Sequence, residues 1–64
     1  MIDTAELRTI MKNRGYREEQ LAEAIGLTQS EFSNRMSEGV FGSDEIDKMI
    51  EILQIEHPET IFFK

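Results

Sequence analysis

The chain has 64 residues, enough for one small domain, and its lack of cysteine excludes disulfides and thiolate metal sites. Thirteen acidic residues against seven lysines and arginines give a formal net charge of −6, which opposes non-specific binding to nucleic acid. Without an apolar run long enough to span a membrane or to serve as a signal peptide, the expected location is the cytoplasm.

The first predicted helix lies in a basic segment. Leu7, Ile10 and Met11 recur at helical spacing, and Arg14 extends this stripe with its apolar stem. Gly15 follows as an expected helix end. Residues 1–17 carry a net charge of +2, whereas residues 18–64 carry −8. The cations available for phosphate contacts are Arg8, Lys12, Arg14, Arg17 and Arg35.

The second predicted helix covers residues 18–25 and ends at Gly26, where a glycine adopts a positive φ without steric cost. Its first turn is acidic, which suits the positive end of a helix dipole. Its inner face consists of Leu21, Ala22 and Ile25. Leu27 follows in the turn and is expected to fill the gap between two helices.

The third predicted helix covers residues 29–37 and begins with a capping box, in which Thr28 and Glu31 accept each other's backbone N–H groups. Its inner face is narrow, with only Phe32 and Met36. In the loop that follows, Phe41 is expected to turn inward, and Val40 is a weaker candidate for the same orientation.

The fourth predicted helix is capped by Ser43 and carries a full apolar stripe. The stripe consists of Ile46, Met49, Ile50 and Leu53. Pro58 fits the first position of a short last turn, and His57 before it is a cap or turn residue rather than a ligand. Of the terminal Ile61, Phe62 and Phe63, two are expected in the core and one in a dimer contact. The predicted fold is a single all-α domain of four to five helices over residues 1–64.

Residues 17–37 have the organisation of a helix-turn-helix: a helix of about two turns, a glycine-led turn and a second helix with few apolar positions. Outside its inner face, the third helix carries uncharged side chains that both donate and accept hydrogen bonds. They are Gln29, Ser30, Ser33, Asn34 and Ser37. Gln and Asn form two hydrogen bonds with adenine, and Ser can pair with either a donor or an acceptor on a base edge. This face therefore favours the reading of base edges.

An ordinary solvated helix face is the alternative interpretation of these five residues, because Ser and Asn are common near helix ends. Such a face would be expected to carry Lys, Glu and Arg, as the rest of this chain does. The combination with the preceding helix and the Gly26 turn favours base reading.

Residues 15–37, with Leu21-Ala22, Gly26, Gln29-Ser30 and Phe32-Ser33, resemble the helix-turn-helix of phage Cro and cI-type repressors. The similarity extends through residues 41–46 to residues 59–63 and to small prophage-encoded regulators. It implies a λ-repressor-like domain whose third helix enters the major groove of operator DNA, usually as a homodimer. It also implies that Gln29, Ser30, Ser33 and Asn34 read bases.

The phosphate contacts expected on this basis are Arg14, Arg17, Arg35 and Ser37. Glu18 stands where the family commonly has a glutamine beside a phosphate. A carboxylate there would repel the phosphate unless a cation compensates its charge, and Arg17 is the adjacent cation in sequence. Met11 and Met36 stand where many relatives bury an Arg–Glu pair, and two methionines fill such a space without a desolvated charge.

No arrangement of residues indicates catalysis, a metal site, a cofactor or a small-molecule ligand, so a non-enzyme is expected. The leading hypothesis is a sequence-specific DNA-binding transcriptional regulator. The main alternative is a protein-interaction module on the same fold, such as an antirepressor or an acidic partner of a basic regulator, favoured by the charge of −8 on residues 18–64. A structural domain of a larger protein is a weaker alternative.

Overall fold

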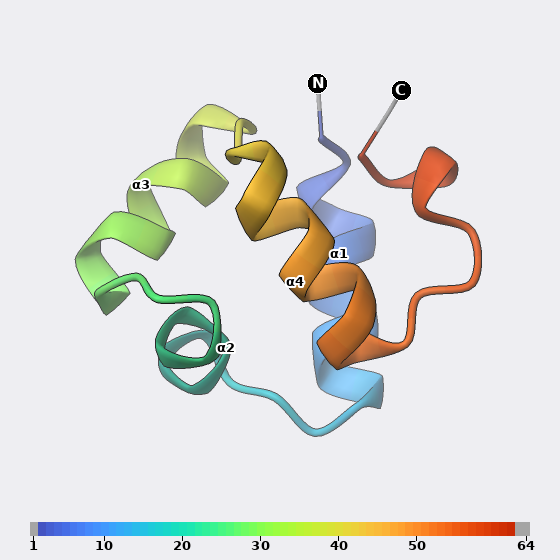
Figure 1. Cartoon of the computed structure of the whole chain (residues 1–64), viewed down its shortest axis with the longest axis horizontal. Coiled ribbons are helices and arrows are strands. Elements are labelled where there is room, and N and C mark those ends of the chain that lie inside the picture. Colours follow the sequence, from blue (N-terminus) through green and yellow to red (C-terminus); the bar gives the residue numbers. More distant parts are fainter. Residues whose placement is uncertain (1, 63–64) are drawn as a thin grey trace.

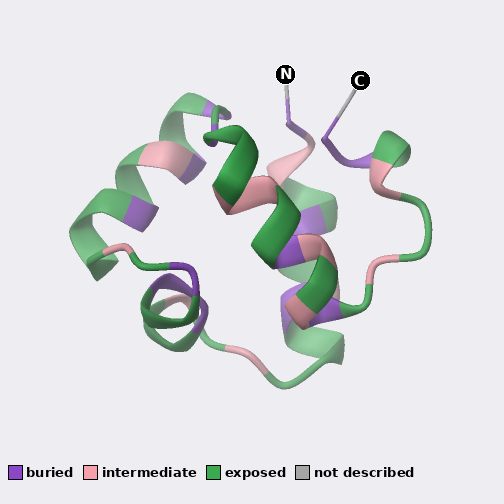
Figure 2. Cartoon of the chain, viewed as in Figure 1, coloured by how far each residue is buried: buried purple, intermediate pink, exposed green. Residues whose placement is uncertain are grey.

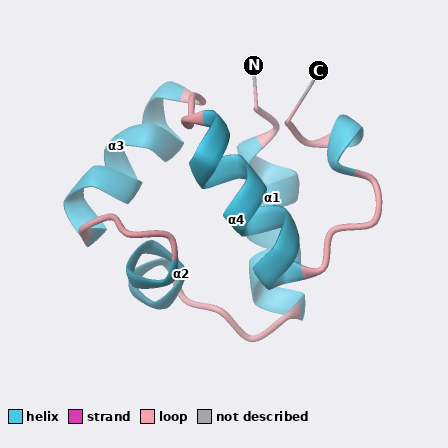
Figure 3. Cartoon of the chain, in the orientation of Figure 1, coloured by secondary structure: helices cyan, strands magenta, loops and turns pink. Residues whose placement is uncertain are grey.

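The computed structural model describes residues 2–62, and all of their regular structure is helical (Figure 3). Four α-helices are followed by a single turn of 3₁₀ helix: α1 (Thr4–Asn13), α2 (Glu18–Ala24), α3 (Gln29–Glu38), α4 (Ser43–Leu53) and η1 (Pro58–Thr60). The prediction of an all-α domain with four helices and a short last turn is confirmed, with bounds that differ by about one residue. No helix within residues 2–62 is long and apolar enough to cross a membrane.

The helices pack around one centre, with α1 behind α4 and α2 seen nearly end-on beneath α3 (Figure 1). After α4 the chain loops outward and returns beside its own beginning. A backbone hydrogen bond fixes this return, because Asp3 donates to the carbonyl of Ile61 at 2.8 Å. A second one joins the same N-terminal segment to the end of α3, with Ile2 donating to the carbonyl of Gly39 at 3.1 Å. The end of α3, the start of α1 and the segment after η1 are therefore tied together.

The core is apolar, and no polar or charged residue among those described is buried. Its members come from all four α-helices, from the loops after α2 and α3 and from the segments at both ends, and Figure 2 shows the buried residues on the inward faces. They are Ile2, Leu7, Met11, Leu21, Ala22, Ile25, Phe32, Met36, Phe41, Met49, Leu53, Ile61 and Phe62. Tyr16, Leu27, Ile46 and Ile50 are half-buried against this cluster. This confirms the expectation for Leu27 in the turn and for the two isoleucines in the stripe of the fourth helix.

Two expectations for apolar side chains need comment. Val40 is 63% exposed, so the suggestion that it turns inward is wrong. Phe41 occupies the space instead, with its ring centroid 5.4 Å from that of Phe32, and successive residues of an extended segment point in opposite directions. Ile61 and Phe62 are both buried as expected, whereas Phe63 lies outside the described residues.

Three helices begin with the same contact, in which the third helical residue accepts the backbone N–H of the N-cap. Gln20 accepts from Arg17 at 3.0 Å, and Glu31 accepts from Thr28 at 2.9 Å. Only α3 completes the box, because the Thr28 hydroxyl accepts the Glu31 N–H at 3.1 Å. The predicted capping box is confirmed.

The expected cap of α4 is wrong by one residue. Ser43 is the first helical residue, and Gly42 is the N-cap, with its N–H donating to Glu45 Oε1 at 2.9 Å. Gly42 has no side chain to accept an N–H of the first turn, and the capping contact made by a side chain here is that of Glu45 with the Gly42 N–H. The start of α4 therefore depends on Glu45.

Candidate nucleic-acid interface

The outward side of α3 presents an uncharged polar surface, called here the polar face. It consists of Gln29, Ser30, Ser33, Asn34 and Ser37, all of them exposed. Within residues 2–62, none of these five side chains donates or accepts an intramolecular hydrogen bond. Their amide and hydroxyl groups are therefore available to a partner.

The inward side of α3 fixes the orientation of the polar face. Phe32 is fully buried and Met36 is 3% exposed, so the helix has little freedom to rotate about its axis. Phe32 also contacts Phe41 of the following loop, with the rings tilted by 58°. Burial of two large side chains on one side leaves the five polar residues facing solvent.

The crossing of α2 and α3 depends on a short turn and a small residue. Ile25 caps α2, and Gly26 follows with φ of 84°, where a side chain would be strained. Leu27 donates its N–H to the carbonyl of Ala22 at 2.8 Å and half-buries its side chain, as expected for the gap between the helices. Ala22 is 1% exposed, so a larger side chain there has no free space.

Arg35 is held at a corner between α3 and α4, called here the α3–α4 corner and made of Arg35, Gly42 and Glu45. Its Nε donates to Glu45 Oε1 at 2.8 Å, and the two side chains are 33% and 17% exposed. This hydrogen bond raises the pKa of Arg35. It also lowers the pKa of Glu45, which the Gly42 N–H lowers further against the opposing effect of burial.

Arg14 is also held within the fold. Its Nε donates to the carbonyl of Leu53 at 2.9 Å, and its Nη2 donates to that of Gln54 at 3.4 Å. Gln54 is the C-cap of α4, so the guanidinium satisfies carbonyl groups that the end of that helix leaves without partners. Arg14 joins α1 to the end of α4 at a distance of about 40 residues in sequence.

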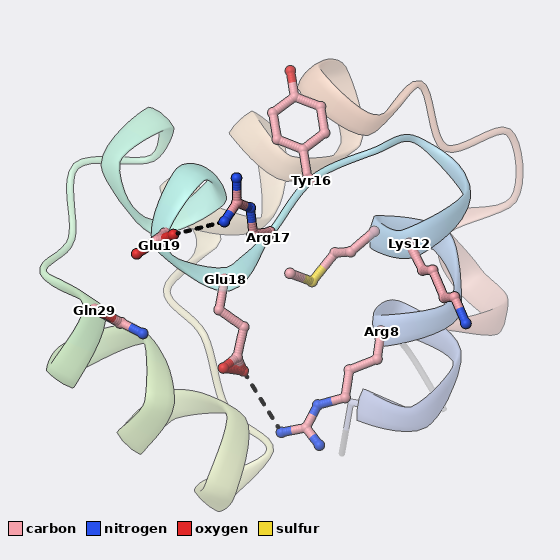
Figure 4. Close-up of a pocket in the computed structure, with 8 residues that line it drawn as sticks. Arg8, Lys12, Tyr16, Arg17, Glu18, Glu19 and Gln29 are labelled. Carbon is pink, nitrogen blue, oxygen red and sulfur yellow. Dashed lines mark ion pairs between the residues drawn. The ribbon is translucent and has the colours of Figure 1, made fainter.

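The other two arginines of the basic segment make loose ion pairs at the surface. Arg17 lies 3.6 Å from Glu19, and Arg8 lies 3.9 Å from Glu18. Figure 4 shows both pairs, with Glu18 pointing toward Arg8 on α1 and away from Arg17. The offset for Glu18 is therefore provided by Arg8, whereas the neighbour in sequence, Arg17, pairs with Glu19.

A cleft of about 550 Å³ opens between α1 and the start of α2, with Gln29 of α3 on its rim. This α1–α2 cleft is lined by Arg8, Met11, Lys12, Tyr16, Arg17, Glu18, Glu19 and Gln29. Three cations against two carboxylates give it a net charge of +1, within a chain of −6. Figure 4 shows Arg8 and Lys12 on one wall and Gln29 on the opposite one.

Two acidic residues near the polar face differ in how they are held. Glu31 is turned back to the start of α3 by the capping box, and the backbone hydrogen bond from Thr28 lowers its pKa. Glu38 is exposed at the end of α3, next to Ser37. The carboxylate of Glu31 is therefore hydrogen-bonded at the start of α3, whereas Glu38 is exposed at its other end.

The structure thus places the four expected base-reading residues on one face and separates the expected phosphate contacts. Arg17 and Ser37 are exposed, whereas Arg14 and Arg35 donate to partners within the fold. The pairing of Arg8 with Glu18 has no signal in sequence, because the two residues lie on different helices. Comparison of the chain with family models, curated proteins and solved structures finds no match in any of the three.

Proposed function

We propose that this protein is a sequence-specific, double-stranded DNA-binding transcriptional regulator that reads the major groove with α3. The polar face is the observation that carries the proposal. Five exposed side chains with free amide and hydroxyl groups lie on one helix face, in a chain of which 31% is charged. Amide side chains of this kind form paired hydrogen bonds with adenine in the major groove.

The resemblance of residues 15–37 to phage Cro and cI-type repressors supports the same function. It implies a λ-repressor-like domain in which α2 would lie across the DNA backbone and α3 would insert into the groove. A homodimer would then place two copies of α3 on half-sites about one helical turn apart. Gln29, Ser30, Ser33 and Asn34 would contact base edges.

Selection of bound duplexes from a pool with a randomised core of about two helical turns supplies a specific probe for this proposal. Fluorescence anisotropy titrations then compare the selected duplex with a scrambled one. Gln29→Ala and Asn34→Ala are each expected to lose about 1–3 kcal/mol of binding free energy on the selected duplex and little on the scrambled one. Asn13→Ala removes the same amide group from an exposed residue of α1 that does not line the α1–α2 cleft, and it is expected to leave binding unchanged.

Two results would overturn this assignment. Selection that enriches no sequence would remove sequence-specific recognition. Equal affinities of the wild type, Gln29→Ala and Asn34→Ala for a selected duplex would show that the polar face does not read bases.

The acidic surface supports a second candidate, a protein-interaction module for a basic partner. Asp44, Asp47 and Glu51 lie at helical spacing on α4, all three are exposed, and none forms an ion pair within residues 2–62. On this alternative the wild type binds no duplex at low salt. In a pull-down the wild type retains a basic protein partner instead. Variants that remove the charge of these three residues no longer retain it.

A further inference from the structure

The four arginines of this chain fall into two groups according to how firmly each side chain is held. Arg14 and Arg35 donate short hydrogen bonds of 2.9 and 2.8 Å to groups elsewhere in the fold. Arg8 and Arg17 lie 3.9 and 3.6 Å from their carboxylates, too far for a hydrogen bond, with side chains 60% and 78% exposed. Loose, exposed pairs of this kind exchange readily for another anion.

Three loosely held cations, Arg8, Lys12 and Arg17, line the α1–α2 cleft. Lys12 lies on α1 one turn after Arg8, is exposed, and forms no ion pair within residues 2–62. With Arg17 on the facing segment, the three side chains surround an open space of about 550 Å³. The cleft therefore offers three available cations in a local environment whose net charge is positive.

The position of the cleft relates it to the polar face. Gln29 is both the first residue of that face and a member of the rim of the cleft. Phosphates one or two nucleotides away from a base that contacts Gln29 lie within about 7 Å of it along the helix axis, since each nucleotide of a strand advances about 3.4 Å along that axis. Arginine and lysine side chains are the usual partners of such phosphates.

We infer that α1 is a DNA-contacting element, in which Arg8 and Lys12, together with Arg17, bind backbone phosphates that flank the bases read by α3. On binding, a phosphate oxygen replaces the Glu18 carboxylate as the partner of Arg8. The inference rests on the proposed function and transfers phosphate binding from Arg14 and Arg35 to the α1–α2 cleft. Met11 and Tyr16 form the less polar part of its lining.

The test uses a fluorescein-labelled duplex of random sequence, because phosphate contacts require no operator. Anisotropy titrations of the full chain over a range of salt concentrations give the slope of log K against log[salt]. Arg8→Gln and Lys12→Gln are each expected to reduce the magnitude of the slope by about 0.9. Each is also expected to weaken binding on the order of tenfold at 0.1 M salt.

Lys48→Gln is the matched control, because it removes the same charge from an exposed position on α4 that does not line the cleft. It is expected to leave the slope unchanged, and circular dichroism checks that each variant is folded. A wild-type slope in the Arg8→Gln/Lys12→Gln double variant overturns the inference, and so does an equal change in Lys48→Gln. If the wild type binds no duplex even at low salt, the proposed function fails as well, which distinguishes the two failures.

Discussion

The α3–α4 corner and the α1–α2 cleft each pair arginine with glutamate, with different physical consequences. At the corner, Glu45 accepts from both Arg35 and the Gly42 N–H, at 2.8 and 2.9 Å, and its side chain is 17% exposed. In the cleft, Glu18 lies 3.9 Å from Arg8 and is 37% exposed. The Glu45 carboxylate is hydrogen-bonded within the fold, whereas the Glu18 carboxylate only lies near a cation at the surface.

This difference shows why counting cations does not locate a phosphate-binding surface. A guanidinium that already donates to a partly buried carboxylate loses that bond when it turns to a phosphate, so its net gain is small. A guanidinium with a loose, hydrated partner gives up little. If this acidic chain binds DNA as proposed, its few exchangeable cations determine where the DNA backbone lies.

Replacement of Glu45 by alanine is expected to have the largest effect, and the effect is on stability. It removes the acceptor for the Gly42 N–H at the start of α4 and the anchor of Arg35, at a cost of about 1–2 kcal/mol. Urea denaturation followed by circular dichroism measures this loss. The distinction between corner and cleft fails if Glu45→Ala unfolds at the same urea concentration as the wild type.

Replacement of Glu18 by glutamine is expected to act on binding and hardly on folding. It removes a carboxylate beside Arg8 in the cleft, so affinity for a random duplex should rise several-fold at low salt. The free energy of unfolding should change by no more than about 0.5 kcal/mol. A duplex titration and a urea curve on the same sample measure both quantities, and unchanged or weaker DNA binding would contradict the role given to the cleft.

The pH dependence of stability gives the smallest expected effect. The pKa of Glu45 is lowered from 4.5, chiefly by the hydrogen bond from Arg35. A lowered pKa stabilises the folded state above the unfolded-state value, and this contribution disappears as the pH falls through the folded-state value. Urea midpoints between about pH 6 and pH 3 should therefore decline less steeply in Glu45→Gln than in the wild type. Parallel curves would contradict a structural role for the charge.

Local features of this fold are predictable from sequence because their partners are close in the chain. Thr28 and Glu31 are three residues apart, and the box that they predict forms with hydrogen bonds of 2.9 and 3.1 Å. Gly26 has the positive φ expected at the end of α2. The polar face follows in the same way, since helical periodicity separates it from Phe32 and Met36.

Tertiary features are not predictable in this way, because the choice among several possible partners is made by packing. Arg14 donates to the carbonyl of Leu53, 39 residues away, where the sequence predicts a phosphate contact. Glu18 pairs with Arg8 on another helix, although Arg17 is adjacent in sequence. The orientation of Val40 also depends on tertiary structure, since the space available in the core is filled by Phe41.

The most direct test of the central claim is a map of amide chemical-shift changes in the ¹⁵N-labelled protein during titration with a short duplex. The account predicts the largest changes in residues 29–37 and around the α1–α2 cleft, with smaller ones on α4. Changes confined to the acidic surface of α4, or no change at any duplex concentration at low salt, would contradict it.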